Sequence, residues 1–487
     1  MKKIIYTFII LNLFNSSLII ISQYMYIDEW LTIACAIASF IMLIYFLSSV
    51  YKKIYKIIYI LLFITSSIWA IYSAYLFPYW NSRAFLAIQG KEYTQTTTPS
   101  RLISSNEALA DLAFCTKTLL KAHPQCRDSF PMETNIKFKQ AHNKITEKDS
   151  ISIIDLYILL QSACASLNDA HTKVCLTNHS NKYADYYQCD EILSINGNTY
   201  HQIVDSTSHL ISSETTKWTE YLINNRLRSY EGLLSLGYNP NKGIEVTYRI
   251  DSSIVTKKYS GKDYNTINFN KHSLSSERIG FYSLPDSNSI AYLKLENCYY
   301  YTLLQRYNFN TGLKNMFSEI KSRSIDNLIL DLRGNPGGNM AIIYEFFKYL
   351  PVQKYDIPVA SYRRGPLLIK MKSHKINSQY KKYIYEGNIY VLTSLSTFSG
   401  GMHFADCLQG NNLATIIGES PANAATCYSN IAPYILPNSK LSLHVSTTRY
   451  NRVNPKDSNA FIKPDIECKA INAYEISLKV IDSNLNK

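Results

Sequence analysis

Apolar residues are distributed unevenly along this 487-residue chain. The first eighty residues contain three long runs without any charged residue, at 4–21, 30–50 and 57–77. A helix needs roughly 17–25 residues to cross the hydrocarbon layer of a membrane, so each run is long enough to do so. We therefore expect residues 1–80 to form three transmembrane helices.

The charges beside these runs predict the orientation of the helices. Lys2 and Lys3 precede the first run and a lysine cluster at 52–56 precedes the third, whereas Asp28 and Glu29 occupy the loop between the first and the second. Cytoplasmic loops carry an excess of lysine and arginine. The N-terminus is expected in the cytoplasm and everything after Phe77 outside it, in a periplasm or at the cell surface.

A polar segment at 81–105 is expected to link the membrane part to a helical subdomain at 106–180. Apolar residues recur at helical spacing from 106 until Pro124, and again from 152 to 167. Residues 185–255 then read as a small α/β module. Its segment "DEILSINGNTY" predicts a strand, a turn at Asn196 and Gly197, a second strand and a helix, and 243–251 alternates as a half-buried strand does.

From 280 to 487 the pattern alternates between strands and helices. Four strand-like runs, "SIAYLKLENC", "NLILDL", "NIYVLTS" and "ATIIGE", are separated by stretches with helical periodicity. This alternation is typical of an α/β core with largely parallel strands. The overall fold class is therefore α/β, preceded by membrane helices.

Composition adds limits on partners and cofactors. The net charge is +13, but the lysines are scattered among many tyrosines and asparagines, which indicates a solvated surface near anionic lipid and no nucleic-acid partner. Three local cysteine pairs are plausible disulfides outside the cytoplasm: Cys115 with Cys126, Cys164 with Cys175, and Cys407 with Cys427. No CxxC pair or Cys/His cluster has zinc spacing, so we expect neither a metal nor another cofactor.

Ser399 is a candidate nucleophile, because "TSLSTFSGGMHF" places it between a predicted strand and a predicted helix. A serine at a helix start can direct its hydroxyl into a cleft. The commoner role of Ser399, or of Thr397, would be to cap that helix.

The segment "LDLRGNPGGN" follows another strand of the same predicted parallel sheet, so its turn belongs at the same sheet edge as Ser399. Glycines allow positive φ and close backbone approach, and the N–H groups of Gly337 or Gly338 and of Gly400 could bind an oxyanion. An ordinary tight turn would look similar.

A third segment, "SLNDAHTKV", supplies a candidate base in His171, with Asp169 and Thr172 beside it. Ten histidines occur in the chain, and most histidines are not catalytic. Spacing alone does not bring His171 to Ser399.

The ordered motifs "LNDAHT", "ILDLRGNPGG", "TFSGGMHFADCLQGNNLATIIGE" and "IKPDI", with His123-Pro124 and "LPNSK" at 436–440, resemble the S41 serine peptidases. This group includes C-terminal processing peptidases, tricorn core peptidases and interphotoreceptor retinoid-binding protein repeats. The resemblance covers residues 106–487. It implies a core of the ClpP/crotonase-like kind and hydrolysis of peptide bonds in a protein or peptide substrate through an acyl-enzyme.

The resemblance also implies roles. Ser399 matches the nucleophile, and Gly400 with Gly337 or Gly338 matches the oxyanion donors. The lysine of the processing-peptidase branch is missing after Glu419, whereas His171 matches the histidine base of the tricorn-like branch.

The acid that would orient His171 stays open. Asp457 lies near the position of a late glutamate in the tricorn-like branch, and Glu419 and Asp169 are alternatives. The module at 185–255 resembles a PDZ domain without its Gly-rich carboxylate loop, which makes it a degenerate, structural or gating unit.

The leading hypothesis is a membrane-anchored serine endopeptidase with an extracytoplasmic active site. A catalytically silent membrane receptor of the same family, binding peptides or other ligands, is the alternative. An esterase is disfavoured because Ser399 lacks the G-x-S-x-G context. With a histidine base, activity is expected to rise near pH 6.5.

Overall fold

The computed structural model describes residues 98–176, 191–259, 280–284, 290–300, 303–364, 367–453 and 460–485, together with isolated positions between 37 and 64. The three predicted spans, at 4–21, 30–50 and 57–77, lie almost wholly outside these residues. In the part of the chain that is described, no helix combines the length and the apolar character needed to cross a membrane.

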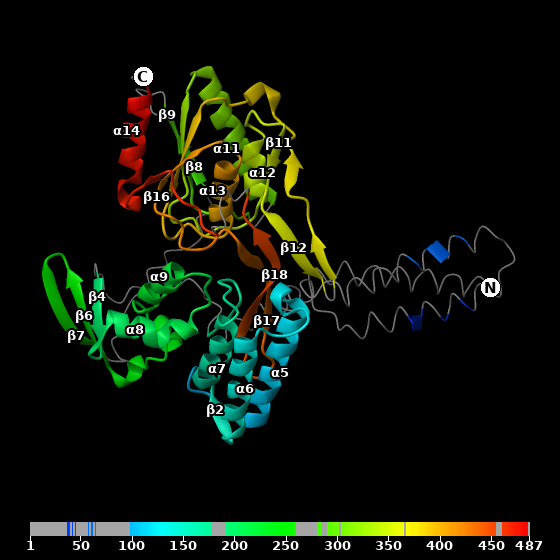
Figure 1. Cartoon of the computed structure of the whole chain (residues 1–487), viewed down its shortest axis with the longest axis vertical. Helices are drawn as coiled ribbons and strands as arrows, with labels where there is room; N and C mark the ends of the chain where they lie inside the picture. The colour runs from blue at the N-terminus through cyan, green and yellow to red at the C-terminus, as the bar shows by residue number, and fades with distance from the viewer. Residues whose placement is uncertain are drawn as a thin grey trace.

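A six-stranded sheet forms the centre of the upper lobe in Figure 1. Its order is β19-β16-β15-β10-β9-β8, and all neighbours are parallel except β8 and β9. The strands are β8 (Gly280–Ser283), β9 (Ile290–Leu295), β10 (Asn327–Asp331), β15 (Asn388–Thr393), β16 (Thr415–Gly418) and β19 (Ile466–Glu467). The predicted α/β core with largely parallel strands is confirmed.

Helices cover both faces of this sheet, because its central strands are apolar on both sides. One face packs against α11 (Leu303–Ser322), α12 (Ala341–Phe347) and α13 (Gly400–Gly410), through a large core that includes Phe317, Phe346 and Phe404. The other face, with Ile329 and Leu392, packs against α14 (Ala473–Leu485), which follows η6 (Ala470–Asn472). The parallel strands all end at one edge, where the loops after β10 and β15 meet.

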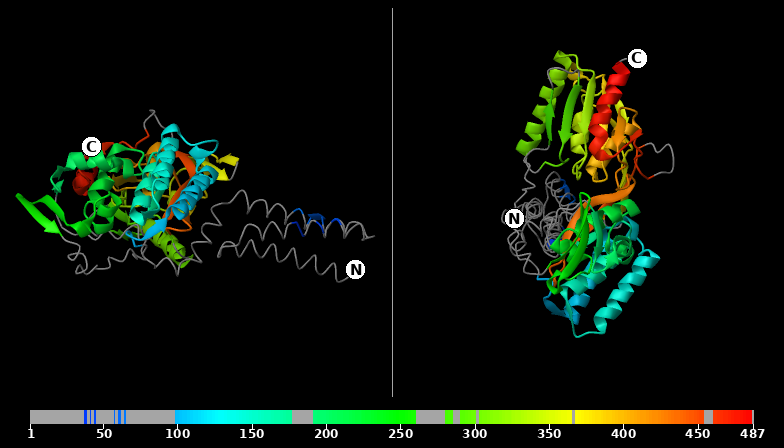
Figure 2. Two further views of the ribbon diagram at one scale, coloured as in Figure 1. Left: turned by 90° about the horizontal axis from the view of Figure 1, so that it is seen from below. Right: turned by 90° about the vertical axis from the view of Figure 1, so that its left-hand side faces the viewer.

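A second sheet connects this core to the lower lobe (Figures 1 and 2). Its order is β13-β12-β18-β17, formed by β12 (Val359–Arg364), β13 (Leu367–Lys370), β17 (Cys427–Ile435) and β18 (Ser442–Asn451). Strand β18 also pairs with β3 (Lys173–Cys175), in the register Lys173 to His444. Strands β11 (Lys354–Asp356) and β14 (His374–Ile376) flank β12 and β13 in the sequence and form a two-stranded antiparallel sheet, which η5 (Lys381–Tyr383) follows.

Three helices form the helical subdomain: α5 (Ser105–Ala122), α6 (Met132–Thr146) and α7 (Ile153–Ala165). The strands β1 (Leu102–Ser104) and β2 (Ser150–Ser152) pair at one end, and η2 (Pro124–Cys126) follows α5. Ser104 and Glu107 form a capping box at the start of α5, which fixes where the helix begins. Asp111 of α5 accepts hydrogen bonds from the backbone of Asn438 (2.9 Å) and Ser439 (2.8 Å), which ties the "LPNSK" turn to this helix.

None of the three cysteine pairs that the sequence made plausible forms a disulfide in the structure. All six cysteines, at positions 115, 126, 164, 175, 407 and 427, are free thiols. Proximity along the chain misled the prediction, because helix packing places Cys115 of α5 against Cys164 of α7. Cys126 lies beside His123 and Cys427 beside His403, with sulfur-to-nitrogen distances of 3.7 and 3.8 Å.

The module at 191–259 has its own small core. Its sheet order is β5-β4-β6-β7, from β4 (Glu191–Ile195), β5 (Asn198–Thr199), β6 (Ile244–Ile250) and β7 (Ser253–Tyr259). Its helices are α8 (Tyr200–Thr207), η3 (Ser208–Leu210), α9 (Thr216–Arg226), α10 (Tyr230–Ser235) and η4 (Pro240–Lys242). The predicted strand, turn, strand and helix of "DEILSINGNTY" are confirmed, whereas the PDZ-like character stays a prediction.

Candidate active site

Ser399 lies in the connection from β15 to α13, at the edge where the parallel strands end. Its φ of 50° and ψ of −117° are unusual for a residue with a side chain, and such a conformation costs on the order of 1–3 kcal/mol. Ser399 occupies the N-cap position of α13, but its hydroxyl makes no capping hydrogen bond. Instead Oγ lies 3.1 Å from Nε2 of His171. A capping role therefore does not explain this serine.

The chain before Ser399 is held in place by the turn after β10. The N–H of Phe398 donates to the carbonyl of Asn335 (2.9 Å), and the hydroxyl of Thr397 donates to the carbonyl of Leu332 (2.9 Å). The N–H of Ser399 itself donates to Oδ1 of Asn423, at 3.2 Å. These contacts fix the strained backbone at the serine.

The glycine turn after β10 lies directly against the start of α13. A Cβ placed on Gly400 would lie 2.7 Å from the nitrogen of Gly338, so neither residue leaves room for a side chain. The N–H of Gly337 is already occupied, because it donates to Oδ1 of Asn335 at 2.8 Å. In contrast, the N–H groups of Gly338 and Gly400 have no hydrogen-bond partner among the residues that the structure describes. Gly338 is also exposed, whereas Gly337 is buried.

His171 reaches Ser399 because its segment is attached to the second sheet. Strand β3, which begins two residues after His171, pairs with β18, and the hydroxyl of Thr172 accepts the N–H of Ser446 at 2.9 Å. The imidazole is 5% exposed and stacks on the ring of Phe398, with centroids 4.8 Å apart. Burial lowers the pKa of His171 to about 4, although the Asp169 carboxylate opposes that shift. The ring is therefore neutral near pH 7.

Asp169 is a fully buried carboxylate next to this histidine. Its Oδ1 accepts the backbone N–H of His171 (2.9 Å), and its Oδ2 lies 3.1 Å from Nε2 of His123. Nδ1 of His123 accepts the N–H of Gln125, so the proton of this ring is on Nε2 and is donated to Asp169. Burial opposes ionisation of Asp169, but the side-chain hydrogen bonds from His123 and Thr172 help to outweigh it and hold the pKa of Asp169 well below its usual range.

The far nitrogen of His171 is not hydrogen-bonded. Nδ1 lies 3.9 Å from Oδ1 of Asp169, which is too far for a hydrogen bond, and no hydrogen bond of ordinary geometry reaches it from the described residues. The backbone of Tyr428 lies close enough to the ring to oppose the lowering of the His171 pKa. Asp169 therefore acts on the imidazole through its charge and through the backbone.

Glu214, in the loop before α9, joins the histidine segment to the serine segment. One carboxylate oxygen accepts the N–H of Ala170 (3.1 Å), and the other accepts from Nδ2 of Asn423 (3.3 Å), the residue that holds the N–H of Ser399. Burial, followed by the charge of Asp169, raises the pKa of Glu214 to about 8.

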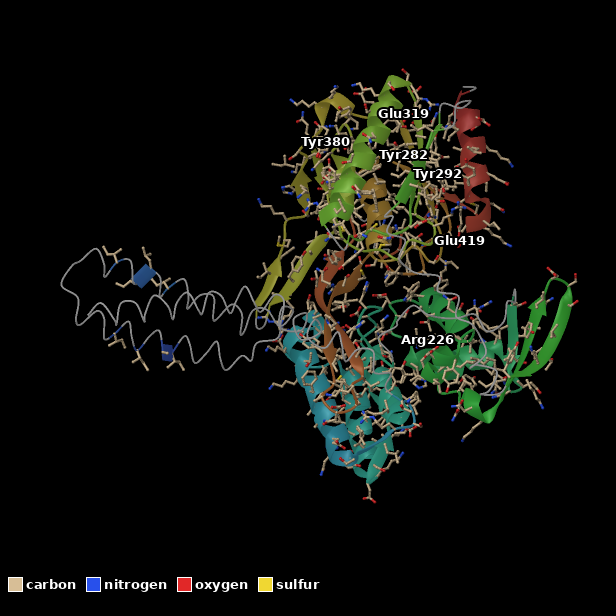
Figure 3. All side chains as sticks on the ribbon, turned by 180° about the vertical axis from the view of Figure 1, so that it is seen from behind. Arg226, Tyr282, Tyr292, Glu319, Tyr380 and Glu419 are labelled. Carbon is tan, nitrogen blue, oxygen red and sulfur yellow. The ribbon has the colours of Figure 1, made fainter. Side chains whose placement is uncertain are left out.

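The two other carboxylates predicted from the sequence are placed differently. Glu419 accepts the backbone N–H of Leu395 at 3.0 Å, so it supports the turn before Ser399. Figure 3 labels it at the lower edge of the upper lobe. Asp457 falls in 454–459, outside the described residues, and its role stays a prediction.

Sequence reasoning missed four contributors to this site: His123 as the partner of Asp169, and Glu214, Asn335 and Asn423. Only His123 gave a signal, through the motif His123-Pro124. The two asparagines lie in Pro/Gly-rich or Pro/Ala-rich loops, where asparagine is common for turn formation alone. Their burial, with 0% exposure for both, is what marks them as structural supports of the site.

The arrangement provides the parts of an acyl-transfer site. A neutral imidazole with Nε2 near a hydroxyl can remove its proton, and two nearby backbone N–H groups can stabilise the oxyanion that follows. Among the described residues, Asp169, His171 and Glu214 are the one group of side chains close enough together to hold a metal ion.

Comparisons with known proteins agree with this chemistry. Residues 289–468 match the family model described as Peptidase family S41. The structure of mature CPAF complexed with lactacystin superposes with a TM-score of 0.55 at 13% identity, covering 78% of this chain and 97% of that chain. Mature CPAF by itself gives the same TM-score and identity, over 77% and 96%. A comparison with curated proteins finds no match.

The photosystem II D1 C-terminal processing protease is a more distant structural neighbour, with a TM-score of 0.43 at 13% identity over 75% of this chain and 93% of that chain. At 13% identity the two CPAF structures show the fold alone. Residues 289–468 match the model of peptidase family S41, and the protein is a serine-type peptidase.

Proposed function

We propose that the protein is an endopeptidase that cleaves its substrates through an acyl-enzyme, with Ser399 as nucleophile and His171 as general base. The observation that carries this proposal is the 3.1 Å distance between Ser399 Oγ and His171 Nε2, two residues from distant parts of the chain. In the first step Nε2 takes the proton of Oγ while Oγ attacks the peptide carbonyl. The protonated ring then gives this proton to the leaving amine, and water hydrolyses the ester.

The oxyanion of each tetrahedral intermediate is assigned to the N–H groups of Gly338 and Gly400. The backbones of the two residues are in contact, and both N–H groups lack another partner among the described residues. The N–H of Gly337 is committed to Asn335, so Gly337 contributes conformation and not a donor.

Asp169 is the carboxylate best supported as the partner of His171. Its fixed negative charge, 3.9 Å from Nδ1, stabilises the imidazolium that forms during the reaction. The hydrogen bond from His123 keeps Asp169 ionised and oriented. Asp457, near the position of the glutamate in the tricorn-like branch, is the second candidate for this role, and an Asp457→Asn variant with undiminished kcat would assign it to Asp169.

The roles of Ser399 and His171 are tested by alanine variants. Ser399→Ala and His171→Ala are each expected to abolish cleavage of a labelled unfolded polypeptide while the protein still unfolds cooperatively. Hydrolysis at the wild-type rate by either folded variant would refute the assignment. The same experiment separates the peptidase from a silent receptor, which would show no cleavage in the wild-type protein.

The proposal places the peptidase on a membrane, with its active site outside the cytoplasm. Its support is the three charge-free runs at 4–21, 30–50 and 57–77 and the lysines that flank them. The protein should then remain with membranes after alkaline carbonate extraction, and added protease should digest residues beyond 98 only from the extracytoplasmic side. Release by carbonate would refute the anchoring.

A further inference from the structure

Three side chains with metal-binding atoms converge behind the imidazole of His171. One ligand atom each from Asp169, His171 and Glu214 lie within 4.8 Å of one another. Nε2 of His171 faces Ser399, and Nδ1 is the ring nitrogen on the side of Asp169. The cluster therefore lies on the opposite side of the ring from the nucleophile.

An independent feature points to a ligand at this place. Nδ1 of His171 is buried and makes no hydrogen bond of ordinary geometry to the described residues, with only the backbone of Tyr428 close to the ring, and the whole side chain is 5% exposed. Leaving a buried polar nitrogen unsatisfied costs about 1–3 kcal/mol. A ligand at Nδ1 would remove that cost.

Of the three cluster residues, Glu214 borders open space, and Ser399 does not line the cavities concerned. Glu214 lines two cavities of about 220 and 400 Å³, both of which also border Asn168 and Thr215.

The donor set selects the kind of ion. One imidazole nitrogen with two carboxyl groups suits Zn²⁺ and similar transition metals, whereas Mg²⁺ and Ca²⁺ prefer all-oxygen sites. Near pH 7 the metal must also displace the proton of Glu214, so its binding should strengthen as the pH rises to 8. Zinc bonds of about 2.0–2.2 Å place neighbouring ligand atoms about 3.4 Å apart, so the side chains must close by on the order of 1 Å. Arg449 borders the smaller cavity, and its positive charge weakens cation binding. These features fit a reversible site better than a permanent structural one.

We infer that Asp169, Glu214 and Nδ1 of His171 form an inhibitory binding site for Zn²⁺ or a similar divalent transition metal. A neutral imidazole carries a single N–H proton. When the metal binds the lone pair of Nδ1, that proton is on Nε2, which then donates to Oγ of Ser399 and no longer accepts its proton. The metal therefore removes the base without touching the serine. The inhibitory effect rests on the proposed role of His171, whereas the binding does not.

Binding is tested in the Ser399→Ala protein, which needs no activity. Titration with Co²⁺ is expected to produce the visible absorption bands of a coordinated ion, and Zn²⁺ should displace them. A Glu214→Gln change should weaken binding by at least about tenfold, because even an outer-shell change typically costs 10–100-fold in metal affinity. Glu319→Gln is the matched control, since Glu319 lies far away on α11 (Figure 3). Equal affinities in the two variants would overturn the site, and Glu214→Asp replaces Glu214→Gln if the latter does not fold.

Inhibition is tested in the wild-type enzyme. Zn²⁺ is expected to stop hydrolysis and a chelator to restore it, while Mg²⁺ and Ca²⁺ at the same concentration have no effect. Each variant is compared with its own metal-free rate. Cobalt binding that depends on Glu214 but leaves hydrolysis unaffected would overturn the inhibitory role. Absence of hydrolysis in the metal-free wild type would instead count against the proposed function, and the binding test would still stand.

Discussion

Replacing Gly338 by alanine is expected to remove one of the two oxyanion donors. A Cβ on Gly338 would lie 2.2 Å from the carbonyl oxygen of Cys298 and 2.3 Å from its carbonyl carbon. Both are backbone atoms, so a side-chain movement cannot relieve the overlap. The φ of 143° is also one that residues with side chains rarely adopt. The turn must therefore shift, and the N–H of Gly338 shifts with it.

The expected decrease in kcat follows from the role of the Gly338 N–H as an oxyanion donor. Loss of one oxyanion donor costs about 2.7–4 kcal/mol of transition-state stabilisation, which is about 10²–10³ in kcat. Gly400→Ala should displace the same N–H group, because the new Cβ would lie 2.7 Å from the nitrogen of Gly338. The matched control is Gly334→Ala on the same turn. Gly334 has a φ of 75° but nothing within 4 Å of its Cβ position, so it should lose about 1–2 kcal/mol of stability and keep its kcat.

The assay measures kcat and KM for an unfolded polypeptide, with urea denaturation of each variant to separate rate from stability. Gly338→Ala and Gly400→Ala should lower kcat strongly with a small change in KM, since the interaction forms only in the transition state. A folded Gly338→Ala variant with a kcat close to that of Gly334→Ala would refute the assigned donor.

Three further outcomes follow from the buried groups around the base. Asp169→Asn weakens the fully buried hydrogen bond from His123 and should lower the free energy of unfolding by roughly 1.5–3 kcal/mol in urea denaturation; an unchanged value would contradict the contact. Because the pKa of His171 is about 4, kcat/KM should fall on the acid side only near pH 4, and not near pH 6.5 as the sequence suggested. A fall in kcat/KM that begins at pH 6.5 or above would contradict the burial of the ring. Burial also lowers the pKa of His403 and of His444 to about 3. The unfolded chain binds protons at these three rings below about pH 6.5 and the folded protein does not, so each ring lowers stability by at most about 1.4 kcal/mol per pH unit as the pH falls from 6.5 towards 4. Burial raises the pKa of Glu214 to about 8 and that of Asp406 to about 6, and these two groups oppose the loss. His403→Gln, which removes one ring, should therefore show a smaller loss of stability between pH 6 and 5 than the wild type, and an equal loss would refute this.

The parallel core could be predicted from the sequence because its strands are short apolar runs bounded by turn residues. Runs such as 327–331 and 388–393 are buried along most of their length. A short, continuous apolar run of this kind predicts a buried strand from local sequence alone. Strands β17 and β18 were not predicted. Their mixed sequences, with Asn430 and Pro433 in β17, follow neither a continuous nor a clearly alternating apolar pattern.

The missing strands explain why the site could not be assembled from the sequence. The approach of His171 to Ser399 depends on the pairing of β3 with β18, and β3 has only three residues. Pairing between segments so far apart leaves no local signal, so only the family resemblance connected the two residues. The same lack of spatial information produced the wrong cysteine pairs and left Glu214 and Asn423 unnoticed.

The central claim is that Ser399 is a nucleophile activated by His171, and labelling with a serine-directed fluorophosphonate probe tests it most directly. The wild-type protein should be labelled at Ser399, as located by mass spectrometry, while the folded Ser399→Ala variant stays unlabelled and His171→Ala is labelled far more slowly. Labelling of the wild type at another serine, or equal labelling rates in the wild type and His171→Ala, would contradict the account.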